Sequence, residues 1–296
     1  MRTSFERERA VFSVIPAIAA TDPQRALQLA RLMRHPRQRA FSLYEVARGA
    51  AGSPGDTLRE AAAEMIETAL SMRRGEDRED SLHDACRMLG FVAKADPDQA
   101  LAFASRLTEE PWHGWALGDI ARAAAETRPD KAVAMIEDEK DEKLRDSLRD
   151  AVATVLADSD LDKAIQLAAS ISDEKGRDGC LYAIVSKFSK TDPARAGELT
   201  RRIVSRERRA SAQCAVVAHL VQADTDRALE MARSIQEGED RYRALSAVAR
   251  EMTRTDADRA VDVARSIENQ AWRAVALCGV ARTLLTPPER RTSGAM

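Results

Sequence analysis

The chain has 296 residues, of which 44% are hydrophobic but only 4% are aromatic, and its formal net charge is -2. So few large side chains do not favour one thick central core, whereas an alanine-rich chain can bury many narrow seams between closely packed helices. The near-neutral charge excludes a global basic field that would attract nucleic acid or an anionic membrane, although local basic patches remain open.

The first predicted element is the apolar stretch at residues 10–20. A secretory signal can contain such a stretch, but Glu6 and Glu8 precede it, and acidic residues at that place are not typical of a signal. The stretch also matches the second half of the repeat described next, so we expect a helix that forms half a repeat over residues 1–21. No apolar run approaches the roughly 20 residues that cross a bilayer, and we expect no membrane partner.

From residue 22 onward, a motif recurs with a period of 32 residues, as in DPQRALQLARLM at 22–33 and DADRAVDVARSI at 256–267. Its apolar side chains recur with helical spacing, and six of the eight copies open with an Asp that can cap a helix, whereas the fourth has Arg128 there. The units start near residues 22, 54, 96, 128, 160, 192, 224 and 256, and the second is lengthened to 42 residues. The capping aspartates are Asp22, Asp96, Asp160, Asp192, Asp224 and Asp256.

Each unit continues, after a short polar turn, with a second apolar helix, as in RAFSLYEVA at 39–47 and RAVALCGVA at 273–281. No segment shows the alternation of apolar and polar residues that is typical of a β-strand. Neither helix can bury its apolar stripe alone, so we expect successive hairpins to stack. The predicted fold is all-α, a right-handed α-α superhelix (solenoid) that forms a single domain over residues 1–286, followed by a flexible tail over 287–296.

The second helix, with an Arg in its first turn and a small, apolar stripe after it, resembles the second helix of HEAT repeats. The Asp-Pro openings resemble the start of tetratricopeptide units. The resemblance covers nearly the whole chain, although the tetratricopeptide signature is absent and short HEAT-like repeats are closer in length than most HEAT repeats. The resemblance implies an architecture whose families mostly hold other macromolecules, and it carries no site with it.

The Arg in the first turn of the second helix is the most regular polar feature, and Ser81 and His113 replace it in two units. In HEAT arrays, such an Arg forms a ladder with Asp. A row of guanidinium groups also suits an acidic peptide or phosphates, but its regularity favours a structural role, in which each Arg binds the turn or the last carbonyls of the preceding helix. The members of this arginine ladder are Arg7, Arg39, Arg145, Arg177, Arg209, Arg241 and Arg273.

Departures from the repeat are the candidate partner-binding residues. Trp112 and Trp115 flank His113, which predicts an aromatic pocket for a partner side chain, although Trp272 at the same repeat position as Trp112 favours packing. The extra residues of the second unit are expected in a loop, which either carries binding or is a tolerated surface loop. A further position of the second helix is occupied by arginine in four units. These arginines either make electrostatic contacts with a partner or form a solvated surface: Arg48, Arg122, Arg250 and Arg282.

Reactive clusters are not evident in the sequence. The cysteines have no metal-ligand spacing, which predicts free thiols in a reducing, cytoplasmic compartment, and neither HExxH nor a Gly-rich phosphate loop occurs. We therefore expect no catalytic residue, metal or cofactor. The leading hypothesis is a non-catalytic interaction protein for a protein or peptide partner. The alternative is a nucleic-acid-binding solenoid of the HEAT-like DNA glycosylase type, which the net charge opposes; a lyase has no motif behind it, and the sequence does not indicate an oligomeric state.

Overall fold

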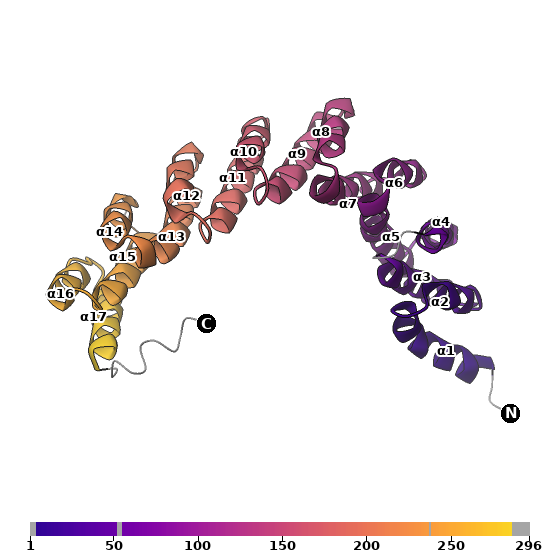
Figure 1. Cartoon of the computed structure of the whole chain (residues 1–296), viewed down its shortest axis with the longest axis horizontal. Coiled ribbons are helices and arrows are strands. Elements are labelled where there is room, and N and C mark those ends of the chain that lie inside the picture. Colours follow the sequence, from indigo (N-terminus) through magenta and orange to yellow (C-terminus); the bar gives the residue numbers. More distant parts are fainter. Residues whose placement is uncertain (1–3, 52–54, 237, 286–296) are drawn as a thin grey trace. The chain divides into compact units, whose positions relative to one another are not determined.

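The computed structural model describes residues 4–51, 55–236 and 238–285, with the main chain alone for 4–9. Within these ranges the protein is all-α, with 17 α-helices, one short 3-10 helix and no strand (Figure 1). The expected tail at 287–296 lies outside the described residues. The chain divides into two compact units, unit 1 at Met1–Leu156 and unit 2 at Ala157–Met296.

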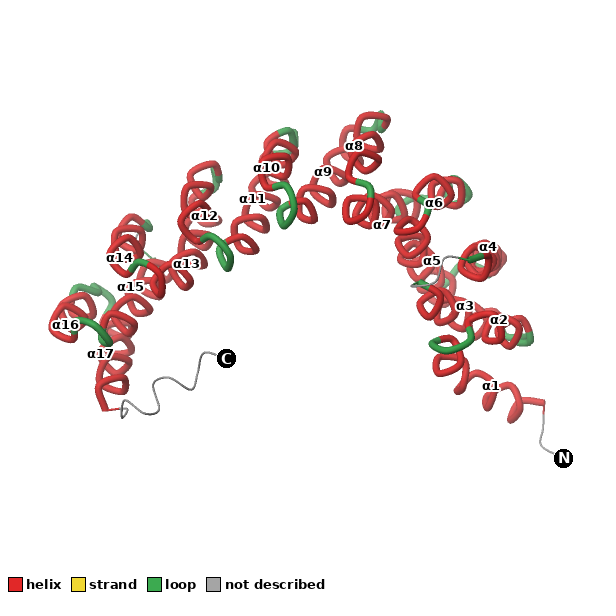
Figure 2. The backbone as a smooth tube through the Cα atoms, in the orientation of Figure 1, coloured by secondary structure: helices red, strands yellow, loops and turns green. Residues whose placement is uncertain are grey.

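Unit 1 is a row of helical hairpins (Figure 2). Each even-numbered helix packs against the odd-numbered helices before and after it, and successive odd-numbered helices pack against one another. The helices are α1 (Ser4–Ala19), α2 (Pro23–Arg31), α3 (Pro36–Ala50), α4 (Asp56–Ser71), α5 (Glu76–Ala95), α6 (Pro97–Ala104), α7 (Trp112–Thr127), α8 (Pro129–Asp138) and α9 (Glu142–Leu156).

Unit 2 follows the same plan, and α11, α13, α15 and α17 form its row of neighbouring odd-numbered helices. The short 3-10 helix η1 (Thr200–Arg202) extends the end of one even-numbered helix. The helices are α10 (Leu161–Ala169), α11 (Glu174–Phe188), α12 (Pro193–Leu199), α13 (Arg206–Ala223), α14 (Thr225–Ser234), α15 (Glu239–Met252), α16 (Ala257–Arg265) and α17 (Gln270–Leu285).

The predicted helix caps are confirmed. In each case the Asp side chain accepts a hydrogen bond from the main-chain N–H three residues later, at 2.9–3.1 Å, so that one otherwise unpaired donor of the first turn is satisfied. The unit that opens with Arg128 lacks this side-chain bond, and its guanidinium instead donates to Ala95 O at 3.1 Å. The caps are Asp22, Asp96, Asp160, Asp192, Asp224 and Asp256.

Small residues set the spacing of the packed helices. The alanine that recurs four residues after each cap is fully buried in every unit that has it, from Ala26 to Ala260. At the contact between α1 and α3, a Cβ on Gly49 would lie 2.2 Å from the Ala19 carbonyl oxygen, closer than any side chain can approach. The interior is therefore a set of thin seams between helices. Removing or adding a single methyl group there disturbs the packing and lowers the stability.

The lengthened unit differs from the sequence-based expectation. Its additional residues were expected in a surface loop, but those that follow Gly75 form the first turns of α5, a helix of 20 residues. Three acidic side chains in this first turn suit the positive end of the helix dipole. Arg78 is buried there and donates to both carboxylate oxygens of Glu109 at 3.0 and 3.2 Å, so this extension of α5 is held by packing and by an ion pair.

Ion pairs also connect successive even-numbered helices, at a spacing of 33 residues that the sequence analysis did not single out. Lys131 binds Asp98 at 2.9 Å in unit 1. In unit 2, Arg259 binds Asp226 at 2.6 Å. All four side chains are largely exposed, so each pair stabilises the stack by at most about 1 kcal/mol.

Candidate functional site

Most of the arginine ladder is bound to the main chain. The Nε atoms of Arg145, Arg209 and Arg273 each donate at 2.8 Å to the carbonyl oxygen six residues earlier, in the turn between the two helices of the hairpin. Arg177 does the same through Nη1 at 2.9 Å. These guanidinium groups close the hairpins by satisfying carbonyls that the preceding helix leaves unpaired.

The remaining members of the ladder differ in their surroundings. Arg39 donates to Glu64 at 3.3 Å. Arg241 borders a small cavity of about 200 Å³ with Arg233 and Glu268. The side chain of Arg7 lies outside the described residues.

The two interruptions of the ladder make different contacts. The Nδ1 atom of His113 lies 3.3 Å from the carbonyl oxygen of Ala104, at the end of α6. Ser81 is fully buried and donates to Asp77 O at 2.7 Å within α5. His113 therefore faces the turn and not an open pocket.

The tryptophans form an aromatic cluster in unit 1. The Trp112 and Trp115 rings meet edge to face with centroids 5.1 Å apart, and His83 of α5 meets Trp115 in the same way at 5.7 Å. Trp112 packs against the core, whereas Trp115 is 49% exposed. Of the three residues predicted to form a partner pocket, only Trp115 offers a large surface to solvent.

In unit 1, the two remaining candidate arginines are neutralised within their own helices. Arg48 binds Glu45 at 2.5 Å, and Arg122 binds Asp119 at 2.6 Å. In both cases the carboxylate lies three residues before the arginine, on the same face of the helix. These two positions therefore contribute little net positive charge to the surface.

The corresponding arginines of unit 2 lie in a different setting. Ala247 occupies the position three residues before Arg250, and Gly279 occupies it before Arg282, so neither helix supplies the carboxylate found in unit 1. Arg250 is exposed and makes no ion pair within the part of the chain that the structure describes. Both arginines border one groove.

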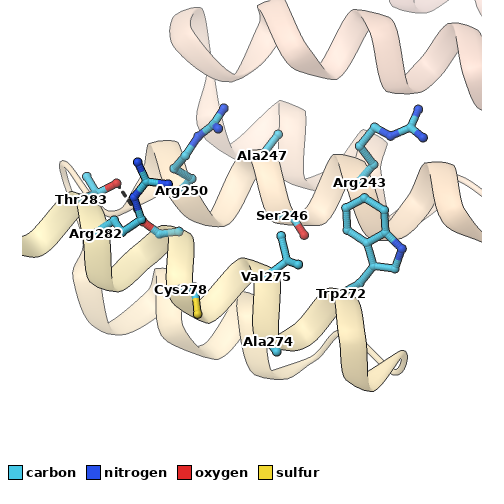
Figure 3. Close-up of a pocket in the computed structure, with 11 residues that line it drawn as sticks. Arg243, Ser246, Ala247, Arg250, Trp272, Ala274, Val275, Cys278, Arg282 and Thr283 are labelled. Atoms are coloured by element: carbon cyan, nitrogen blue, oxygen red, sulfur yellow. Dashed lines mark hydrogen bonds between the residues drawn. The ribbon is translucent and has the colours of Figure 1, made fainter.

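This groove lies between α15 and α17 and has a volume of about 740 Å³. Figure 3 shows Trp272 and Arg243 at one end, Arg250 and Arg282 at the other, and small or apolar side chains between them. Arg243 is already engaged, because it binds Glu239 at 2.8 Å and Asp240 at 3.5 Å. The lining consists of Arg243, Ser246, Ala247, Arg250, Trp272, Ala274, Val275, Cys278, Gly279, Arg282 and Thr283.

The groove is open to solvent and partly apolar. Val275 is 56% exposed, and Cys278 is an exposed free thiol, whereas Cys86 and Cys214 are buried. Burial raises the pKa of Cys86 to about 12 and also raises the pKa of Cys214. An exposed apolar strip with guanidinium groups at its rim is typical of a surface that binds a polypeptide.

Sequence reasoning identified Arg250 and Arg282 but missed the rest of the groove. Arg243 and Val275 follow the ladder position by two residues, and Trp272 precedes it by one. A comparison of the outward-facing positions in the last two units would therefore have identified all three residues. The replacement of Glu45 and Asp119 by Ala247 and Gly279 was also legible in the sequence.

The described residues contain no cluster of three or more His, Cys, Asp or Glu side chains that could hold a metal ion. Nor does any helix in the described ranges have the length and hydropathy needed to cross a membrane.

Comparisons with known proteins do not assign the chain to a family. No family model matches it, and no curated protein matches it. Among solved structures, the chain is similar to Ton1535 from Thermococcus onnurineus NA1, with 14% identity and a TM-score of 0.34 over 95% of this chain and 92% of that chain. A likeness this weak carries no argument about fold or function.

Proposed function

We propose that this protein is a non-catalytic interaction protein that binds a segment of a partner protein in the groove between α15 and α17. The observation that carries the proposal is the groove itself, in which the exposed apolar side chain of Val275 lies with Trp272 and the exposed Arg250. Aromatic and arginine side chains are the residue types that contribute most to protein interfaces.

The proposal includes an architecture. Hairpins packed in a row within each unit support a HEAT-like, right-handed superhelix over residues 1–286. Cysteines that are free and, for three of the four, buried support a reducing, cytoplasmic location.

Nucleic acid is the weaker candidate partner. Binding to a phosphate backbone needs several cations that are not already paired. Arg48 and Arg122 are paired within their helices, and most ladder arginines are bound to turn carbonyls. These guanidinium groups are therefore already engaged within the protein, and the formal net charge of -2 also disfavours a polyanion.

The test is a selection from a displayed peptide library, followed by affinity measurements by fluorescence anisotropy. The wild type should enrich peptides that bind with micromolar affinity, and a variant with Arg250→Glu and Arg282→Glu should bind them at least about tenfold more weakly, equivalent to about 1.4 kcal/mol. The matched control, Arg201→Glu with Arg202→Glu, makes the same charge change at exposed residues outside the groove and should bind normally. Failure to enrich any peptide, or equal binding by the two variants, would contradict the proposal.

A further inference from the structure

We infer that unit 1 carries a second interaction surface, which takes a proline-rich segment in the polyproline II conformation with an acidic residue between its prolines. The surface consists of three exposed rings, Phe41 of α3, His83 of α5 and Trp115 of α7, and we call it the ring row. The ring row belongs to unit 1, whereas the groove belongs to unit 2, so this inference does not rest on the proposed function.

The ring row follows from the register of the repeat. Each of its three residues stands two positions after the ladder position of its helix. Because α3 packs against α5, and α5 against α7, equal register positions come to lie on neighbouring helices (Figure 2). The centroids of His83 and Trp115 are 5.7 Å apart, and Phe12 of α1 meets Phe41 at 5.4 Å. In α9 the same position is Ser147, so the ring row ends at α7.

The rings are packed from the side and remain open to solvent. Phe41 is 36% exposed and Trp115 is 49% exposed, and His83 is also exposed. Trp112, which is half-buried, meets Trp115 edge to face and holds its ring in place. Within the described ranges the indole N–H of Trp115 has no hydrogen-bond acceptor, so it is available to a carbonyl of a ligand.

The spacing of the rings selects the conformation of the ligand. Packed helices lie about 8 to 10 Å apart, so successive rings of the row have about this separation. A polyproline II helix has three residues per turn and rises about 3.1 Å per residue, so every third residue returns to the same side after about 9.3 Å. Extended strands return to one side after about 6.6 Å, and an α-helix does so after about 5.4 or 10.5 Å. The pattern Pro-x-x-Pro-x-x-Pro therefore places one proline opposite each ring.

Proline suits these rings chemically. Surfaces lined by aromatic side chains bind proline-rich segments because the polyproline II helix is already formed before binding and loses little conformational entropy. Its main-chain carbonyls have no internal partner and can accept a hydrogen bond from the indole of Trp115.

The charges beside the ring row restrict the ligand further. Arg37 of α3 binds Asp80 of α5 at 2.8 Å. The arginines at positions 48 and 122 are paired within their own helices. A nucleic acid would have to displace these carboxylates before its phosphates could bind the same cations, so the rings favour a polypeptide.

Arg87 of α5 supplies the charge that an acidic ligand would meet. It lies one helical turn after His83 on the same face of α5, and its Cζ is 5.5 Å from the centre of the Tyr44 ring. Arg87 is exposed and forms no ion pair within the described part of the chain. Asp84, in the same turn, interacts with it electrostatically without binding it. A carboxylate between two prolines of the ligand can therefore bind this guanidinium.

The experiment measures the binding of fluorescent peptides to the full chain by fluorescence anisotropy. The acidic peptides contain Pro-Ala-Glu-Pro-Ala-Glu-Pro or Pro-Glu-Ala-Pro-Glu-Ala-Pro between glycines, because the chain direction of the ligand is open. A peptide of the same composition, Pro-Pro-Pro-Ala-Glu-Ala-Glu, removes the spacing, and two others carry Gln or Lys in place of Glu. At least one acidic peptide should bind at least about tenfold more tightly than each of these three. Equal binding of the peptide with clustered prolines would overturn the inference.

Variants of the protein locate the binding. Phe41→Ser, His83→Ala and Trp115→Ala should each weaken binding of the acidic peptide at least about tenfold. The matched control is Leu32→Ser, which removes a 65% exposed apolar side chain of unit 1 outside the ring row and should bind normally. Loss of binding in this control as large as in the ring variants would contradict the inference.

The decisive variant is Arg87→Glu, because it should reverse the charge preference. This variant should bind the Lys peptide more tightly than the acidic peptide, and a loss of folding cannot produce such a reversal. An unchanged preference for the acidic peptide would overturn the role of Arg87 and with it the inference.

Other outcomes separate the ring row from the groove. The variant with Arg250→Glu and Arg282→Glu should bind the proline peptides normally. If it loses them while Trp115→Ala keeps them, the peptides bind in the groove; the inference is then wrong and the proposed function stands. Failure of every proline peptide to bind would also overturn the inference. So would tighter binding, dependent on Trp115, of an α-helical peptide with leucine at every seventh residue or of a single-stranded oligonucleotide.

Discussion

Replacement of Asp178 by Ala is expected to destabilise unit 2 more than any exposed substitution in it. Asp178 lies in α11, is 1% exposed, and accepts hydrogen bonds from the main-chain N–H groups of Val204 at 2.9 Å and Ser205 at 2.6 Å. A single buried carboxylate thus holds the turn that leads into α13. Its removal leaves both N–H groups without their acceptor.

The magnitude follows from these two bonds. A hydrogen bond to a charged group contributes about 1.5 to 3 kcal/mol, but Val204 is half exposed, so water will replace part of the loss. We expect the free energy of unfolding to fall by about 2 to 4 kcal/mol. For a unit of this size, at about 3 °C per kcal/mol, the melting temperature should fall by about 6 to 12 °C.

The position of the tryptophans allows the assay to follow unit 2 alone. Trp272 is the one tryptophan of unit 2, so fluorescence in a background with Trp112→Phe and Trp115→Phe reports its unfolding in urea or on heating. Glu174→Ala is the control, because it removes an exposed carboxylate from the same helix and should change stability by less than about 0.5 kcal/mol. A loss for Asp178→Ala as small as that of the control would refute the reasoning.

Two further predictions concern packing and thiol chemistry. Gly49→Ala forces α3 away from α1 and should lower the free energy of unfolding by about 1 to 3 kcal/mol in denaturant titrations, whereas Gly118→Ala, which has open space around it, should be neutral or slightly stabilising; equal effects would contradict the close approach of these helices. In timed alkylation read by mass spectrometry, Cys278 should react well before Cys86 at pH 8, because the raised pKa of Cys86, about 12, keeps that thiol protonated until the pH approaches this value. Faster modification of Cys86 in the folded protein would show that its burial is wrong.

The sequence predicted the helices well because the repeat combines three independent local patterns: a capping Asp, a buried Ala and an apolar stripe. It predicted the lengthened unit less well. The extra residues are rich in charge and contain Gly75, which reads as a loop, but Arg78 finds a carboxylate in Glu109, 31 residues away. A tertiary ion pair of this kind is not visible in local patterns.

Only part of the groove could be predicted, because its remaining lining residues come together through the packing of neighbouring helices. Arg250 and Arg282 stand out in the sequence, but so do Arg48 and Arg122; the sequence contains the acid three residues before the second pair, and the structure shows that this acid binds the arginine. Trp112 and Trp272 also share a repeat position, yet the first packs in an aromatic cluster and the second lines a groove. Equivalent register positions do not have equivalent neighbours, since those are set by the adjoining helix.

The residue three positions before each of these arginines determines whether the arginine forms an ion pair within its own helix. It lies outside the buried seam in α15 and α17, so a change there alters the local charge without altering the stacking of helices. With Glu or Asp at this position the arginine is paired within its own helix, and with Ala or Gly that pair cannot form. A chain built in this way can gain, lose or move a recognition patch by single substitutions, and a designer could write such patches into any of its repeats.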